Sequence, residues 1–403
     1  MILSILIAQN LGPEGIGGYH FALKLVVIIS SISQLGMTNL IIRDLNKDNL
    51  IDSEEFRNNY LNKVLWTQII FSLIIICLIS LLIIITKEMV EEYFSESIYF
   101  LVLFVLLCIP TTLNISLNAV YISKNKLWQG ELLSNSLDKI ILVVTLWFAH
   151  LIGYEIGLTS LAIWKFLIGI LIALIMIYSL KELKLKSPDF MTRKMFEDAK
   201  PILQANIFTL IGKNIDIFLI GYFLSVRELG IYAVASRIPF LIDIILKSMN
   251  GEMAPTITQF YYKNKINQLN HFIQKYIRIG VLVSIIGLVF SIIFGRMILL
   301  LWGAEFQEGY LVFILLIASQ GLNLSSIGSS MSLTICGFQD KVRNITIYGI
   351  ILKIVLITLL MYYKGLFGIA LGILIHSLII NITKVILNKK YLGLKFYVQH
   401  YRN

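Results

Sequence analysis

The chain has 403 residues, of which 57% are hydrophobic and 14% charged, and its formal net charge is +10. Soluble domains contain about 45–50% apolar and about 25% charged residues, so this composition excludes a soluble globular protein and equally a disordered one. Long continuous apolar runs, in place of short alternating strands, indicate a polytopic helical membrane protein.

The first ten residues are mostly apolar but too few to cross a bilayer core of about 30 Å. The turn residues Gly12 and Pro13 follow almost at once. The stretch has no basic n-region and no small-residue cleavage site, so it does not resemble a signal peptide. We expect it to be the second part of a first helix that is truncated in this chain.

Eleven further apolar runs are long enough to span a membrane. They cover residues 19–42, 64–86, 98–122, 132–151, 156–180, 202–224, 231–254, 277–301, 310–335, 345–363 and 366–387. The loops on one side of these runs carry 22 of the 34 Lys and Arg residues, and the loops on the other side carry four. Cytoplasmic loops collect positive charge, so the sequence predicts that the side of Arg43 and the C-terminus is cytoplasmic. This distribution also explains the net charge without a nucleic-acid partner.

The chain repeats itself weakly at an offset of 213 residues. Residues 7–24 align with residues 220–237, and the matches include Gly17 with Gly230, Tyr19 with Tyr232 and the cation Lys24 with Arg237. Both copies face the same way, which is typical of parallel repeats with a substrate site between the halves. We therefore predict two six-helix lobes related by a parallel pseudo-two-fold axis. The expected domains are an N-terminal lobe at 1–180, a basic cytoplasmic linker at 181–201 and a C-terminal lobe at 202–403 with a short cytoplasmic tail.

Charged residues inside the spans are the strongest functional signal, because each central ion costs roughly 2.5–3.5 kcal/mol to insert. The ranges above contain ten cations and four acids. Arg278, Arg296 and Glu252 lie toward span ends and are counted with the loops, which leaves eight cations and three acids within the spans. Pairing cannot neutralise this excess, so we expect a hydrated cavity that binds an anion. The predicted substrate-binding residues are Lys24, Lys139, Lys165, Lys213, Arg237 and Lys353, and the candidate ion-coupling residues are Asp138, Asp216 and Asp243.

Structural explanations compete with these assignments. Lys247 follows Asp243 by four residues, and Asp216 follows Lys213 by three, so both pairs match helical ion-pair spacing. Lys384 lies near a span end, from which its ammonium group can reach the interface. The three cysteines and five histidines show no metal-binding spacing, and we expect no metal and no cofactor.

Three segments carry a family resemblance. Residues 5–23 read ILIAQNLGPEGIGGYHFAL, residues 36–47 read GMTNLIIRDLNK, and residues 216–238 read DIFLIGYFLSVRELGIYAVASRI. These segments resemble the polysaccharide flippases, which translocate O-antigen and capsule repeat units, within the multidrug/oligosaccharidyl-lipid/polysaccharide exporter superfamily. The resemblance covers nearly the whole chain, but family members usually have twelve or more full spans and this chain lacks the front of the first.

The resemblance implies a flippase in the bacterial cytoplasmic membrane. Its implied substrate is an undecaprenyl-(pyro)phosphate-linked oligosaccharide, made on the cytoplasmic leaflet for capsule or lipopolysaccharide and moved to the outer leaflet by alternating access. The implied partners are polysaccharide polymerase and assembly proteins. Lys24 and Arg237 match basic positions that line the cavity of the related lipid II flippases.

Two alternatives remain open. The first is a multidrug-type antiporter of small molecules or cations in the same superfamily, although cationic drugs favour acidic cavities. The second is a polyprenyl-dependent membrane glycosyltransferase or polymerase, which requires a large polar extracytoplasmic loop. The extracytoplasmic loops predicted here are short and contain no catalytic constellation. We therefore predict a transporter and not an enzyme.

Overall fold

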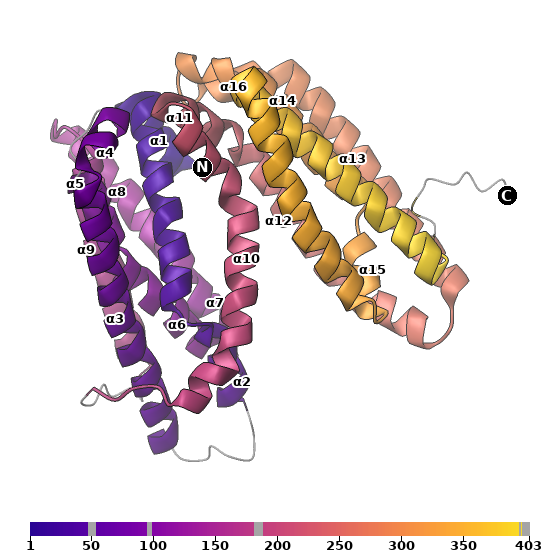
Figure 1. Ribbon diagram of the computed structural model, residues 1–403, viewed down its shortest axis with the longest axis horizontal. Helices are drawn as coiled ribbons and strands as arrows, with labels where there is room; N and C mark the ends of the chain where they lie inside the picture. Colours follow the sequence, from indigo (N-terminus) through magenta and orange to yellow (C-terminus); the bar gives the residue numbers. More distant parts are fainter. Residues whose placement is uncertain (47–53, 95–98, 181–187, 395, 397–403) are drawn as a thin grey trace. The chain divides into compact units, whose positions relative to one another are not determined.

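A computed structural model describes residues 1–46, 54–94, 99–180, 188–394 and 396, and within these ranges the chain is helical, with turns and no β-strand (Figure 1). The first part contains α1 (Ile2–Ser33), α2 (Met37–Leu45), α3 (Glu54–Ile85), α4 (Lys87–Phe94), α5 (Tyr99–Leu106), α6 (Cys108–Ser123), α7 (Leu127–Glu131), the π-helix η1 (Leu132–Leu137), α8 (Asp138–Leu151), α9 (Leu158–Ser179) and α10 (Arg193–Phe223). The second contains α11 (Val226–Ala235), α12 (Arg237–Tyr262), α13 (Ile266–Leu300), the 3₁₀-helix η2 (Ala304–Gly309), α14 (Tyr310–Ser325), α15 (Ser329–Ile335) and α16 (Gln339–Leu392).

Nine helices in the described ranges are long and apolar enough to cross a membrane, and the bent pair α11 and α12 makes a tenth. Two of these long helices are merged pairs. α1 is interrupted at Gly12, where φ is 64°, and α16 is interrupted at Gly365, where φ is 54°. The kink at Gly365 separates the predicted runs 345–363 and 366–387. The expected all-α, multi-span membrane fold is confirmed.

Proline explains two of the breaks within spans. Proline has no N–H to offer the carbonyl four residues earlier, and its ring clashes with that carbonyl. α5 ends at Leu106, four residues before Pro110, and α11 ends at Ala235, four residues before Pro239. Each proline then lies in the first turn of the next helix, where its missing donor is harmless. The local sequence therefore determines where these spans bend.

The described chain clusters into two compact units. Unit 1 comprises Met1–Gly221 with Ser225–Arg227, and unit 2 comprises Tyr222–Leu224 with Glu228–Asn403. α10 therefore falls in unit 1, although the predicted C-terminal lobe begins at residue 202. Part of the predicted linker is the helical start of α10, while its residues 181–187 and the tail residues 397–403 lie outside the described ranges. We retain the predicted lobe boundaries as a proposal about the two transport halves.

Unit 1 is organised around α6, most of whose residues are buried and which contacts α1, α2, α3 and α9. Buried amides stabilise the turn between α1 and α2. There Gln68 Nε2 donates to the Gln34 carbonyl at 3.1 Å, and Ser116 Oγ donates to Gln68 Oε1 at 2.8 Å. These bonds satisfy polar groups at the end of α1, where helical partners are missing. The chain then reverses at Gly36, where φ is 74°.

Unit 2 contains a core that includes Met253, Ile273 and Leu333, from α12, α13 and α15. α13 and α14 approach closely, since a Cβ on Gly280 would lie 2.3 Å from the Leu324 carbonyl oxygen. Small residues permit such contacts, which drive helix association in membranes in place of the hydrophobic effect. Many large apolar side chains of α13 and α16 are exposed, as lipid-facing helices require.

Candidate functional site

An ion pair joins two of the predicted site residues across helices in unit 1. Lys165 Nζ on α9 lies 3.2 Å from Asp138 Oδ2 at the start of α8. The two side chains are mostly buried, with 19% and 21% of their surfaces exposed. Asp138 Oδ1 is buried, and among the described residues it has no hydrogen-bond partner. Lys165 therefore provides the main compensation for a carboxylate held inside a predicted span.

The residues before Asp138 form a π-helix, η1, which interrupts the α-helical span from α7 to α8. Such π-segments frequently occur at functional sites, because the extra residue in the turn changes where side chains point. Glu131, just before η1, accepts hydrogen bonds from Asn118 Nδ2 at 3.1 Å and Asn135 Nδ2 at 2.6 Å. In the sequence, Glu131, Asn135 and Asp138 recur at helical spacing and form a polar stripe, but Glu131 and Asn118 were not predicted as site residues.

The other predicted site residues of unit 1 occupy different environments. Lys139 is exposed, and its Nζ donates to the backbone carbonyl of Asn135 on the same helix. Lys213 is exposed, whereas Asp216 on the next turn of α10 is buried. Lys24 on α1 is half-buried. Asp216 and Lys24 both interact with other residues, so neither is without a partner.

Unit 2 contains the remaining three predicted site residues. Arg237 lies where α11 and α12 meet at a 42° bend, and it is half-buried. Asp243 pairs with Lys247 one turn later on α12, with Oδ2 2.5 Å from Nζ. This confirms the ion pair expected from their spacing. Lys353 on α16 is half-buried and interacts electrostatically with His376 on the same long element.

A row of hydrogen bonds links α16 to α14 and α15. Asn381 Nδ2 donates to Asn323 Oδ1 at 2.8 Å, and Ser332 Oγ donates to Asn388 Oδ1 at 2.6 Å. The Ser and Asn run that begins at Asn323 therefore packs one helix against another, as small and polar residues do in membrane proteins. We assign it to structure and not to substrate binding.

The three cysteines are free thiols, of which Cys77 is exposed and Cys108 and Cys336 are buried. Cys336 lies outside the candidate spans, between α15 and α16. Burial raises the pKa of its thiol to about 11. Within the ranges that the structure describes, no group of three His, Cys, Asp or Glu side chains is arranged to hold a metal ion.

Comparison with known proteins gives matches along most of the chain. A family model described as polysaccharide biosynthesis protein matches residues 1–261, and a model described as MatE matches residues 201–363. A probable low-salt glycan biosynthesis flippase of Haloferax volcanii is 23% identical over 368 residues, which cover 91% of this chain and 74% of that protein. A probable flippase of the same organism is 24% identical over 174 residues, which cover 42% of this chain and 37% of that protein.

Solved structures share the fold. An inward-facing multidrug resistance MATE family transporter of the MOP superfamily has a TM-score of 0.77 at 15% identity, with 97% of this chain and 93% of that chain covered. A MOP superfamily transporter from Pyrococcus furiosus, described as having a binding pocket of reverse polarity, has a TM-score of 0.61 at 15% identity, with 97% and 91% covered.

Proposed function

Since the chain belongs to the polysaccharide biosynthesis protein family, we propose that it translocates lipid-linked oligosaccharides across a membrane. It is a multi-pass membrane transporter of the flippase type and not an enzyme. The proposed substrate is a repeat unit on undecaprenyl (pyro)phosphate, destined for O-antigen, capsule or lipopolysaccharide and moved from the cytoplasmic to the outer leaflet of a bacterial cytoplasmic membrane. The two curated relatives are archaeal, so membrane and carrier are parts of the proposal that need their own test.

The observation that carries the proposal is the surplus of positive charge inside the spans, eight cations against three acids. A glycan on a phosphate or pyrophosphate has an anionic polar head and an oil-soluble tail. A cation-lined hydrated cavity binds the head, while the tail stays in lipid. Arg binds phosphate as a two-donor fork, and Lys binds it as a point charge. We assign the head group to Lys24, Lys165, Arg237 and Lys353, with Lys139 and Lys213 as more exposed members of the set.

Of the three candidate coupling acids, Asp138 is the one we favour. Asp243 pairs with Lys247 on its own helix, whereas Asp138 pairs with Lys165 on a different helix. Protonation of Asp138 would release the Lys165 ammonium group for a substrate phosphate. The proton and the substrate would then compete for one ion pair, which biases the two states of alternating access.

Coupling is tested by driving translocation in proteoliposomes with an imposed proton or sodium gradient. We expect a gradient to accelerate translocation by the unaltered protein and to have no effect on Asp138→Asn. Asp243→Asn is the matched control, and it should keep the response. A rate that ignores every gradient and the membrane potential would contradict coupling altogether.

Complementation tests the substrate assignment. Loss of the gene should leave lipid-linked glycan on the cytoplasmic leaflet, and the unaltered gene should restore export. Lys24→Ala, Arg237→Ala and Lys353→Ala should each lower export at equal protein levels, whereas Lys87→Ala should not, because Lys87 lies outside the spans and pairs with Glu91. Unchanged export by all three variants would refute the cation-lined site. Polymerase and assembly proteins are the proposed partners, and co-purification with them would support this part.

The proposed orientation places the C-terminus in the cytoplasm. Its basis is the loop charge, 22 cations against four. A phosphatase fused to the C-terminus should be inactive, because this reporter requires an extracytoplasmic location, and activity would reverse the assignment.

A second candidate function is antiport of small cationic molecules. The match of residues 201–363 to the MatE model favours it. Efflux of a cationic dye discriminates the two, because a cavity with excess positive charge should repel the dye. Gradient-driven dye efflux without glycan translocation would establish the antiporter instead.

A further inference from the structure

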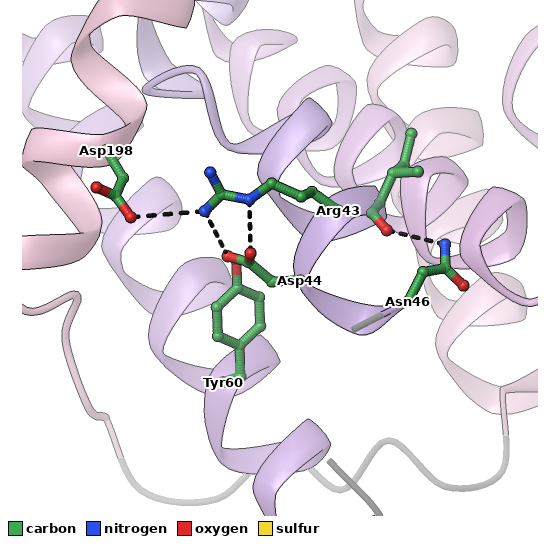
Figure 2. A network of polar contacts seen from close by, with 6 residues as sticks. Arg43, Asp44, Asn46, Tyr60 and Asp198 are labelled. Carbon is green, nitrogen blue, oxygen red and sulfur yellow. Dashed lines mark hydrogen bonds and ion pairs between the residues drawn. The ribbon is translucent and has the colours of Figure 1, made fainter. Parts of the chain in front are cut away.

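The beginning of α10 is docked on α2 and α3 through a polar network (Figure 2). Arg43 Nε lies 2.7 Å from Asp44 Oδ1, and an Arg43 terminal nitrogen lies 3.5 Å from Asp198 Oδ2 on α10. Tyr60 on α3 donates its hydroxyl to Asp44 Oδ2 at 3.2 Å. Arg43 therefore bridges a carboxylate on its own helix to one that is 155 residues away in the chain.

Two more contacts hold the segment that leads into α10. Lys63 Nζ lies 3.4 Å from Asp189 Oδ2, and the Met191 backbone N–H donates to Thr67 Oγ1 at 2.9 Å. Lys63 and Thr67 both belong to α3. The docked segment therefore runs from residue 189 to residue 199, along the side of the molecule that the loop charges predict to be cytoplasmic.

The turn between α1 and α2 touches the same segment by its backbone. A Cβ added to Gly36 would lie 2.6 Å from the Ala199 carbonyl oxygen and 2.8 Å from the Leu203 nitrogen. Ala199 is fully buried. Only glycine permits this approach, so the docking is built into the turn and does not depend on long side chains alone.

Along most of its length, α10 is otherwise loosely held. Five of its 31 residues are buried, namely Ala199, Asn214, Asp216, Ile217 and Ile220. No residue from 200 to 213 is buried. The C-terminal end is fixed by Phe21, whose ring packs against Phe218 at 5.7 Å and would collide with a Cβ on Gly221. α10 is thus fastened at two ends with an open middle.

The two attachments differ in strength. The C-terminal one consists of contacts between the half-buried Phe21 ring and both Phe218 and Gly221, next to the buried side chains of Ile217 and Ile220. The N-terminal one combines the close backbone contact of Gly36 with Ala199 and ion pairs whose side chains are exposed, 46% and 48% for Arg43 and Asp198, and such pairs are individually weak. Because the side-chain contacts at the N-terminal end are weak ion pairs and residues 200–213 are not buried, α10 can detach at its N-terminal end and pivot about its C-terminal end.

We propose that the contacts of residues 189–199 with α2 and α3 form a reversible latch. The latch holds the start of α10 against α2 and α3 in one state of the transport cycle and releases it in the other. This inference rests on the alternating access of the proposed function. It assigns to Arg43, Asp198 and Gly36 the role of setting the balance between the two states. These residues bind no substrate in the proposal.

A disulfide across the docked segment tests whether the latch must open. The hydrogen bond between the Met191 N–H and Thr67 Oγ1 makes these two residues neighbours, and they are the pair chosen for the cross-link. Thr67→Cys with Met191→Cys, in a background whose native cysteines are serine, should translocate normally when reduced and lose most activity when oxidised. The matched control is Ser319→Cys with Ser377→Cys, whose hydroxyls are 2.7 Å apart in unit 2 and whose cross-link should leave activity unchanged.

The outcomes separate the latch from the proposed function. Full activity of the oxidised pair at 67 and 191 would show a permanent anchor and refute the latch. Absence of translocation by the serine background and the unaltered protein would instead refute the proposed function. Arrest by the control cross-link as well would show that any constraint stops transport, and the latch would lose its support.

A second measurement does not need the substrate. Ala199→Cys places a buried thiol under the latch, and its labelling by a membrane-impermeant maleimide reports detachment. Gly36→Ala should raise the labelling rate at least tenfold, because the new methyl group collides with α10. Gly153→Ala is the matched control, since Gly153 has the same φ of 74° but nothing within 4 Å of the added methyl group.

The ion pair gives a smaller and reversible effect. Arg43→Asp should raise labelling by about two- to fivefold, the range expected for an exposed pair, and adding Asp198→Arg should restore the original rate. The latch would be overturned if all these variants were labelled at the same rate. It would be overturned equally whether that common rate matched the unfolded protein or was zero.

Discussion

Replacing Lys165 by methionine removes the ammonium group that compensates the Asp138 carboxylate at 3.2 Å. At an effective dielectric constant of about 20, two unit charges at that separation attract by about 5 kcal/mol, and desolvation offsets part of this. Removing one partner costs roughly 3–5 kcal/mol for a buried pair and about 0.2–1 kcal/mol for an exposed one. With about a fifth of each side chain exposed, we expect Lys165→Met to destabilise the protein by about 2 kcal/mol.

A double-mutant cycle isolates the pair from its surroundings. Asp138→Asn alone should cost less than Lys165→Met, because it leaves a cation whose stem can reach water. The double variant should be more stable than the sum of the single losses predicts, by about 1–2 kcal/mol. Lys247→Met is the control, because its pair with Asp243 is more exposed, at 57% and 32%, and we expect a loss below about 0.5 kcal/mol.

The assay is unfolding in mixed micelles, with increasing denaturing detergent and helix content followed by circular dichroism. Midpoints of the unaltered protein, the two single variants and the double variant give the coupling energy, and the Lys247 variant is the control. Strictly additive single losses would refute the reasoning. A Lys165→Met loss as small as that of the control would do the same, since the compensation argument requires a stronger effect at the less exposed pair.

Three further predictions concern unit 2. Gln274 is 2% exposed, and among the described residues its amide atoms have no hydrogen-bond partner. Gln274→Leu should therefore raise the free energy of unfolding by about 1 kcal/mol. A lower unfolding midpoint would show that the amide is hydrogen-bonded in the protein. A Cβ at Gly368 would lie 2.0 Å from a backbone carbonyl oxygen across the Gly365 kink, so Gly368→Ala should sharply reduce the yield of folded protein, whereas Gly287→Ala, with nothing within 4 Å, should be well tolerated. The pKa of the Cys336 thiol is raised to about 11, so about one part in a thousand is thiolate at pH 8. A water-soluble alkylating reagent should therefore modify it slowly, faster as the pH rises toward 11, and at once after unfolding. Rapid modification of the folded protein at pH 8 would contradict the burial of this thiol.

The local rules of the sequence anticipated the helices well. Apolar length predicted the spans, and the proline residues explain where two of them bend, before Pro110 and Pro239. The i,i+4 spacing predicted the pair of Asp243 and Lys247. Each of these features depends on residues close together in the chain, where geometry follows from the helix repeat.

Contacts between helices could not be predicted in the same way. Asp138 and Lys165 are 27 residues apart, and both were assigned separate roles before the structure joined them. Arg43 was counted as a loop cation and Asp198 was given no role, because no periodicity relates residues 155 positions apart. Glu131 was noted only as part of a polar stripe, since its bond to Asn118 requires the packing of α6 against α7.

Reconstitution tests the central claim most directly. Purified protein is placed in proteoliposomes with a labelled undecaprenyl-pyrophosphate-linked oligosaccharide, and the appearance of the glycan on the opposite leaflet is measured with an impermeant glycosidase. The account predicts protein-dependent translocation of the intact lipid-linked glycan that falls strongly when Lys24 and Arg237 are replaced by alanine. The account would be contradicted if folded protein that exports a cationic dye translocated the glycan no faster than empty liposomes do.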